Sequence, residues 1–166
     1  MVFGMSLWTY TVIHVLISFA GIGSGLAVAM GLISGKPLNK LTVFFLVTTV
    51  LTSLTGFGFP FTHLLPSHIV GIISLVCLAV AIAARYVLHM AGVWRSIYVV
   101  TAMISLYLNV FVLIVQSFEK VPALKALAPT QKEPPFLVAQ LTVMAIFIVI
   151  SILAVKKFRH TQLAAV

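Results

Sequence analysis

Polar side chains recur on one side of an otherwise apolar segment that runs from Arg95 to Phe118. They are spaced three, four, four and seven residues apart, in the order Tyr98, Thr101, Ser105, Asn109 and Gln116. At 3.6 residues per turn, these intervals keep all five on one side of a helix, which we call the polar stripe. Hydrocarbon offers a polar group no hydrogen-bond partner. We therefore expect the stripe to face other helices, a cavity or a bound molecule.

His14 is an ionisable residue inside the first apolar segment, eight residues after Ser6. An ionisable side chain at such a position is a candidate functional residue. Three roles stay open: a neutral imidazole hydrogen-bonded to another helix, a metal or haem ligand, and a contact to a proton or a substrate. A haem held by two histidines needs them at matched depth on facing helices. The sequence offers no such pair at mid-membrane, which weakens the haem interpretation.

Several other polar residues are expected near the same side of the membrane as His14. An outward-facing pocket for a small molecule would use an apolar lining with a few convergent polar groups. The candidates are His14, Thr52, Asn109, Gln116 and Gln140. A metal site would need imidazole and carboxylate donors, although their spacing here is not specific. The candidates are His14, His63, His68 and Glu119, with Glu133 as a further carboxylate.

The composition is that of an integral membrane protein in a lipid bilayer. Hydrophobic residues make up 62% of the 166 residues and charged residues 7%, whereas soluble domains average about 25% charged residues. The net charge of +8 does not indicate nucleic-acid binding. The basic residues lie at the ends of apolar segments, where they set topology and meet lipid headgroups, and they form no basic strip with interleaved aromatics.

The apolar segments predict an all-α bundle of five transmembrane helices in one domain, residues 1–166. Segments of about 20 apolar residues indicate helices rather than strands of a barrel. The expected helices cover 6–33, 41–61, 68–89, 95–118 and 136–157. Ser67 is the expected N-cap of the third helix. The long connection before the fifth helix is expected to hold a short interfacial helix, with an apolar face of Val121, Leu124, Leu127 and Ala128.

Five spans place the two termini on opposite sides of the membrane. One side receives both acidic residues and three basic ones, Lys120, Lys125 and Lys132. The other receives seven basic residues, Lys36, Lys40, Arg85, Arg95, Lys156, Lys157 and Arg159. Because basic residues favour the cytoplasmic side, we expect the C-terminus in the cytoplasm and the N-terminus outside.

Three short segments resemble a family of small multi-pass bacterial membrane proteins of unknown function. They are Thr55-Gly56-Phe57 at the end of the second helix, Trp94-Arg95-Ser96-Ile97-Tyr98 at the start of the fourth, and the residues from Ala128 to Phe136. His14 within the first helix fits the same resemblance. The resemblance implies a location in the bacterial inner membrane and carries no activity, cofactor or substrate with it.

Three functions remain open from the sequence. The first is binding of a small molecule or redox cofactor, namely a quinone, haem or metal, in the outward-facing pocket. Gly21 and Gly25 are small residues four apart on the first helix, a spacing that favours close helix packing. The second function is an accessory or scaffold subunit, in which the face of Gly21 and Gly25 would dock a partner chain. The third is a small-solute transporter, although the inverted repeats and broken helices of many transporters are not evident. No nucleophile motif or phosphate-binding glycine loop indicates an enzyme class.

Overall fold

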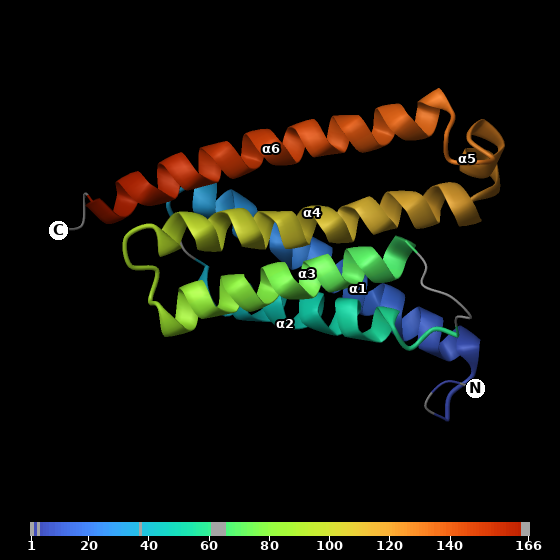
Figure 1. Cartoon of the computed structure of the whole chain (residues 1–166), viewed down its shortest axis with the longest axis horizontal. Coiled ribbons are helices and arrows are strands. Elements are labelled where there is room, and N and C mark those ends of the chain that lie inside the picture. The colour runs from blue at the N-terminus through green and yellow to red at the C-terminus, as the bar shows by residue number, and fades with distance from the viewer. Residues whose placement is uncertain (1, 3, 37, 61–65, 164–166) are drawn as a thin grey trace.

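The computed structural model describes residues 2, 4–36, 38–60 and 66–163, with side chains as far as Phe158. Long helices run side by side along the molecule, and the two ends of the chain lie at its opposite ends (Figure 1). The elements are α1 (Leu7–Ile33), α2 (Asn39–Gly56), α3 (Pro66–Ile82), the π-helix η1 (Ala83–Val87), α4 (Trp94–Lys120), α5 (Pro122–Leu127) and α6 (Pro134–Leu163). We call the end where α1 begins the N-terminal end, and the other the C-terminal end.

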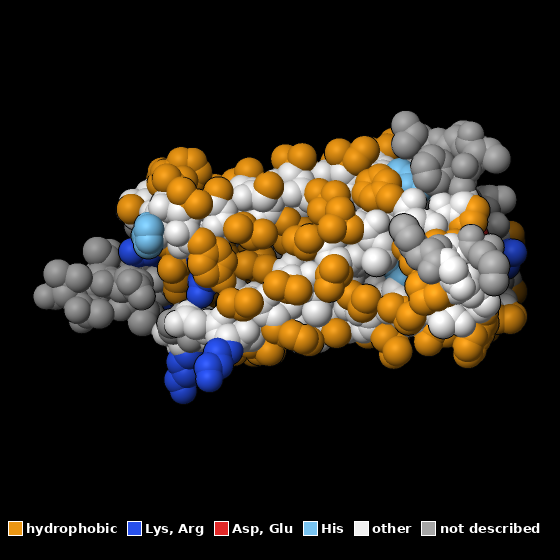
Figure 2. Space-filling view, turned by 90° about the horizontal axis from the view of Figure 1, so that it is seen from below, with side chains coloured by type: hydrophobic (Ala, Val, Ile, Leu, Met, Phe, Trp, Pro, Cys, Tyr) orange, Lys and Arg blue, Asp and Glu red, His pale blue; other side chains and the backbone are white. Residues whose placement is uncertain are grey.

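Four helices are long and apolar enough to cross a membrane: α1, α3 together with η1, α4, and α6 as far as Phe158. Hydrophobic side chains cover the length of the face drawn in Figure 2, and Lys and Arg lie at its ends. The chain is therefore a helical membrane protein. The 18-residue α2 is not among the four, because it begins with Asn39 and Lys40 and contains five threonines.

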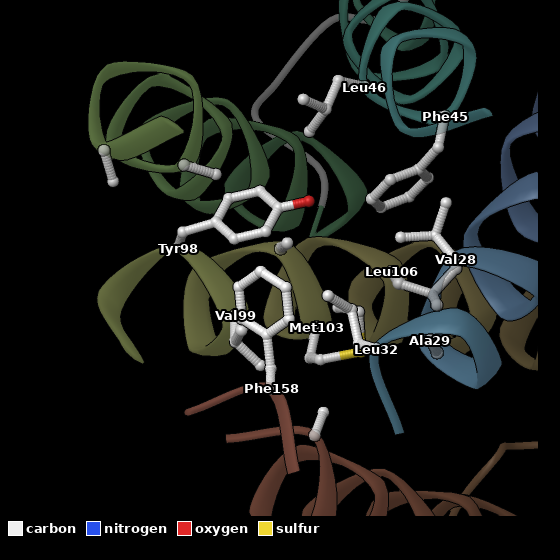
Figure 3. Close-up of a cluster of buried hydrophobic side chains, with 14 of the residues drawn as sticks. Val28, Ala29, Leu32, Phe45, Leu46, Tyr98, Val99, Met103, Leu106 and Phe158 are labelled. Carbon is white, nitrogen blue, oxygen red and sulfur yellow. The ribbon is translucent and has the colours of Figure 1, made fainter. Parts of the chain in front are cut away.

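The core fills the C-terminal half of the bundle, where α1, α2, α3, α4 and α6 all contribute buried side chains (Figure 3). The labelled residues of Figure 3 include Phe45 of α2, Leu106 of α4 and Phe158 of α6, each at most 2% exposed. Tyr98 and Ser105 of the polar stripe are fully buried here. The prediction that the stripe faces inward is confirmed at these two positions.

Small residues on α1 allow close packing within the chain itself. A Cβ added at Gly25 would lie 2.5 Å from Leu106 of α4 and 2.8 Å from Phe45 of α2. Both Gly21 and Gly25 are buried. The helix-packing interpretation of these glycines is thus confirmed. The face of α1 that carries these glycines thus packs on α2 and α4 within the chain, and docking of a partner chain through Gly21 and Gly25 stays a prediction.

Several predicted helix ends differ from the structure. The second helix was expected to reach residue 61, but α2 ends at Gly56, and two turn residues and a bend follow. Glycine at 56 and 58 and proline at 60 explain the early end. α3 begins at Pro66, which suits the first turn of a helix, so Ser67 lies inside α3 and is not its N-cap. α4 begins at Trp94 and ends at Lys120, and α6 runs from Pro134 to Leu163, so both helices are longer than predicted.

The short α5 returns the chain from α4 to α6. Its predicted apolar face is only half buried: Ala128 is fully buried and Leu124 packs on the same cluster, whereas Val121 and Leu127 are 44% and 57% exposed. The cluster joins α4 and α6 through Phe118 and Phe136, whose rings meet edge to face at 5.4 Å. At the N-terminal end, α4, α5 and α6 therefore form one packed unit.

Candidate functional site

The polar stripe leaves the packed core at the middle of α4. From Tyr107 to Ser117, eleven consecutive residues are all partly exposed. In the preceding half of α4, by contrast, Tyr98, Val99, Ala102, Ser105 and Leu106 are fully buried. Eleven residues go around a helix three times. Between Tyr107 and Ser117, no side of α4 is therefore fully buried.

The neighbours of α4 separate in this half. Tyr10 is the one buried residue in the described first two turns of α1, and its hydroxyl donates to the carbonyl oxygen of Thr55 in α2 at 2.7 Å. The buried residues of α6 here, Phe136 and Gln140, contact α4. Figure 1 shows α1 and α6 diverging toward the N-terminal end. We use the name N-terminal crevice for the region of the described structure bordered by His14, Thr52, Asn109, Gln116 and Gln140, which lie on α1, α2, α4 and α6.

Asn109 lies at the base of this crevice. A Cβ added at Gly21 of α1 would be 3.3 Å from the Asn109 Nδ2, and equally 3.3 Å from the Oγ1 atoms of Thr48 and Thr49. The Nδ2 is buried and has no hydrogen-bond partner among the described residues. The side chain as a whole is partly exposed. Asn109 thus brings an amide to the junction of α1, α2 and α4 without satisfying its hydrogen bonds.

Gln116 continues the stripe two helical turns farther out, about 10 Å along α4 from Asn109. Its side chain is partly exposed, and it makes no hydrogen bond within the described part of the chain. Asn109 and Gln116 therefore present two neutral amides on one face of α4. Such groups are costly in hydrocarbon unless a partner satisfies them.

His14 lies on the α1 wall of the crevice, two turns outward from Gly21. Its Nδ1 is 2.8 Å from the Thr55 Oγ1, and the hydroxyl of Thr55 donates to the carbonyl oxygen of Leu51 at 2.7 Å. Because a hydroxyl has one hydrogen, Nδ1 must be the donor in the pair with His14. In the neutral tautomer that carries its proton on Nδ1, Nε2 has a lone pair that can accept a hydrogen bond. Phe59 packs edge-on against the ring at 5.2 Å.

Threonines of α2 extend the polar lining from Asn109 toward His14. Thr52, a predicted ligand-binding residue, is buried and donates its hydroxyl to the carbonyl oxygen of Thr48 at 2.9 Å. Thr48 likewise donates to the carbonyl oxygen of Phe44 at 2.7 Å. Their hydroxyl hydrogens are thus engaged, as is common for threonine in membrane helices. Their oxygens remain able to accept, which suits them to face a donor such as the Asn109 amide.

Gln140 has a structural contact that the sequence did not indicate. Its Nε2 donates to the carbonyl oxygen of Phe111 at 3.2 Å, and Gln131 donates in the same way to the carbonyl oxygen of Val115 at 3.0 Å. These two acceptors are one turn apart on α4, so the two glutamines fasten α6 and the connection before it to α4. The Gln140 Oε1 is buried and has no described partner. That atom and the second hydrogen of Nε2 remain for a ligand.

The predicted metal ligands do not come together in the described structure. Among the described residues, no three His, Cys, Asp or Glu side chains form a group that could hold a metal ion. His68 is buried and its ring stacks on Phe57 at 5.5 Å. Glu119 is exposed, and Glu133 accepts hydrogen bonds from Thr130 before α6 begins. His63 lies outside the described residues.

The candidate site is therefore a set of polar side chains on α1, α2, α4 and α6 in the N-terminal half of the bundle, with no metal-binding group among the described residues. Comparisons with protein-family models, curated proteins and solved structures found no match. The resemblance to small bacterial membrane proteins stays a prediction. Two of its segments, Thr55-Gly56-Phe57 and the start of α4 at Trp94, lie at opposite ends of the bundle.

Proposed function

We propose that the protein spans the membrane five times and binds a neutral, largely apolar molecule in the N-terminal crevice. In this proposal the N-terminal end faces outward and the C-terminus lies in the cytoplasm, following the distribution of basic residues. The resemblance noted above favours the bacterial inner membrane. The crevice would then open toward the extracytoplasmic side.

The fifth span in this proposal is α2. Its 18 residues correspond to about 27 Å of helix, close to the thickness of the hydrocarbon layer. Phe45 and Leu46 of α2 belong to the core shared with α1, α3 and α4, so α2 is enclosed on several sides. Packing of this kind supports α2 as a membrane span, although its own hydropathy is too low to identify it as one. Asn39 and Lys40 would lie at the cytoplasmic interface.

One observation carries the ligand proposal: Asn109 and Gln116 are partly exposed on one face of α4 and make no hydrogen bond to any residue that the structure describes. Neutral amides recognise carbonyl and hydroxyl groups, and each net hydrogen bond contributes about 0.5–1.5 kcal/mol. The aliphatic residues between them suit an apolar body. A quinone is the ligand class that best combines these features, because it carries carbonyl groups on an apolar ring.

The proposed roles follow from the hydrogen-bonding capacity of each residue. Gln116 donates to a carbonyl of the ligand, and Asn109 fixes the deeper end of the molecule. His14 accepts through Nε2 from a hydroxyl, which a reduced quinone carries. Thr52 lines the wall. Gln140 contributes through Oε1 while its Nε2 holds α6 in place.

A binding measurement with purified protein in mild detergent tests the proposal. The probe is a short-chain quinone, titrated into wild type, Asn109→Leu and Gln116→Leu. Each substitution is expected to weaken binding about three- to tenfold, corresponding to the loss of one hydrogen bond. The matched control is Ser117→Ala, because the Ser117 hydroxyl donates to the carbonyl oxygen of Leu113 in its own helix. Equal quinone affinity in all four proteins would contradict the proposal.

The accessory-subunit alternative gives a different result in the same preparation. It predicts that wild type binds no quinone and co-purifies stoichiometrically with a larger membrane complex. A haem or metal cofactor would appear as a Soret band or as stoichiometric metal lost in His14→Ala. Either result would replace the quinone proposal, which predicts a colourless and metal-free protein.

A further inference from the structure

Arg85 is the basic residue most closely integrated into the C-terminal end of the bundle. It lies in η1, and its Nη2 donates to the Oδ1 of Asn39, the first residue of α2, at 2.7 Å. Its guanidinium also lies over the ring of Tyr98 in α4, 5.1 Å from the centroid, and 5.6 Å from that of Tyr86. Contacts from α2 and α4 thus fix the guanidinium in one place.

The position of Arg85 follows from the register of α3. The buried face of α3 contains Leu78 and Ala81, and Arg85 follows them by seven and four residues, which places it on the same face. The helix widens into η1 at this point, and Met90 and His89 then take left-handed φ values of 53° and 49°. Such values are uncommon for residues other than glycine. π-Helical turns and backbone strain are both frequent at functional sites.

The charge of Arg85 has no acidic counterpart in the described structure. The chain has two acidic residues, Glu119 and Glu133, and both lie at the N-terminal end, beside α5 and α6. A guanidinium has five N–H donors. Besides the bond to Asn39, the guanidinium donates through Nη1 to the Met90 sulfur at 3.8 Å. Arg85 is partly exposed, so the remaining donors can be reached from outside.

The Tyr98 hydroxyl is a buried polar group close to the guanidinium. Tyr98 is fully buried, and its hydroxyl has no partner at hydrogen-bond distance among the described residues, although Thr42 and Arg85 lie near it. In Figure 3 this hydroxyl points toward the side of the core where α2 lies. Lys40 follows Asn39 directly, and Arg95 precedes Tyr98 by one helical turn. The ends of three helices therefore carry positively charged residues at the C-terminal end of the bundle.

We propose that Arg85, together with Asn39 and Lys40, binds a phosphate group at the C-terminal end of the bundle. The planar fork of a guanidinium matches two phosphate oxygens, and charge-assisted hydrogen bonds of this kind are about twice as strong as neutral ones. The phosphate belongs to an anionic lipid headgroup or is free in solution. Asn39 and the Tyr98 ring already hold the guanidinium. Binding of a phosphate therefore costs the Arg85 side chain little further conformational entropy.

The test measures thermal stability of the purified full chain in a neutral detergent. The probes are short-chain phosphatidylglycerol, short-chain phosphatidylcholine and inorganic phosphate. The variants are Arg85→Gln, Arg85→Lys and, as a control at the opposite end, Lys125→Gln. Phosphatidylglycerol is expected to raise the melting temperature of wild type and Lys125→Gln. Its apparent affinity is expected to fall about tenfold in Arg85→Gln and less in Arg85→Lys, which keeps the charge but not the fork.

Each outcome decides the proposal. Inorganic phosphate that reproduces the shift and competes with the lipid indicates a free phosphate site, whereas a shift from the lipid alone indicates a headgroup site. An equal shift with phosphatidylglycerol in Arg85→Gln and wild type would overturn the proposal. If Arg85→Gln does not fold, native mass spectrometry of wild type and Arg85→Lys decides. Selective retention of phosphatidylglycerol over phosphatidylcholine, weaker in Arg85→Lys, is expected, and no selectivity contradicts the site.

Discussion

The carboxamide nitrogen of Asn109 lies against Gly21, so close that a Cβ added at Gly21 would be 3.3 Å from it. The missing side chain of a glycine on α1 thus makes room for a polar group on α4. The contact marks the boundary between the packed half of the bundle and the half in which α1 and α6 diverge. Stability and ligand binding should therefore respond differently to substitutions on its two sides.

Gly25→Ala is expected to destabilise the protein, because the new Cβ would lie 2.5 Å from Leu106 and 2.8 Å from Phe45. Overpacking of this kind costs about 1–3 kcal/mol. Gly23→Ala is the matched control, since a Cβ at Gly23 meets nothing within 4 Å and alanine favours the helix by up to about 1 kcal/mol. Melting temperatures in detergent should fall for Gly25→Ala and stay equal or rise for Gly23→Ala. The reverse order would mean that α1 does not pack as described.

Asn109→Leu separates a ligand-binding role from a helix-packing role. Leucine is nearly isosteric with asparagine and removes a buried N–H that has no partner. We expect the melting temperature to stay equal or to rise, while quinone binding weakens. A protein that loses several degrees of melting temperature would indicate instead that the amide holds α1, α2 and α4 together.

Gln131 combines a left-handed backbone, φ 58°, with a hydrogen bond from its side chain to Val115. Gln131→Ala and Gln131→Gly both remove that hydrogen bond, but only glycine adopts positive φ without steric cost. The glycine variant should therefore be more stable than the alanine variant by about 1 kcal/mol. Denaturation of the two variants under the same conditions checks this. Equal stability would contradict the backbone conformation at this turn.

Glu133 should make stability depend on pH in the acid range. Desolvation acts to raise the pKa of its carboxyl, but hydrogen bonds from Thr130, from its own N–H and from Lys132 outweigh it and hold the pKa below its usual 4.5. Because the folded pKa is depressed, the contribution to stability is present above pH 4.5 and lost as the pH falls through the folded value. Wild type should melt higher than Glu133→Gln at pH 6, and the difference should vanish in strong acid. If the difference in melting temperature persists in strong acid, the carboxylate charge is not the source of that difference.

The sequence predicted those features that depend on residue spacing along one helix. The inward direction of Tyr98 and Ser105 followed from the period of the helix, and the packing of Gly25 followed from small residues four apart. Features that depend on pairs of distant residues were missed. The contacts of Arg85 with Asn39 and of Gln131 with Val115 join different elements, and no periodicity indicates them. The widened turn of η1 also has no signal in the local sequence.

The central claim is that the N-terminal crevice opens outward and holds a neutral apolar ligand. The most direct measurement labels Gln116→Cys in membranes with a membrane-impermeant maleimide, in a Cys77→Ala background, with and without a short-chain quinone. Ile104→Cys serves as control, because it lies on the same helix in the packed half and is 38% exposed at the lipid-facing surface. We predict that Gln116→Cys reacts from the outer side and is protected by quinone, while Ile104→Cys does not react. An unreactive Gln116→Cys, or labelling that quinone does not slow, would contradict the account.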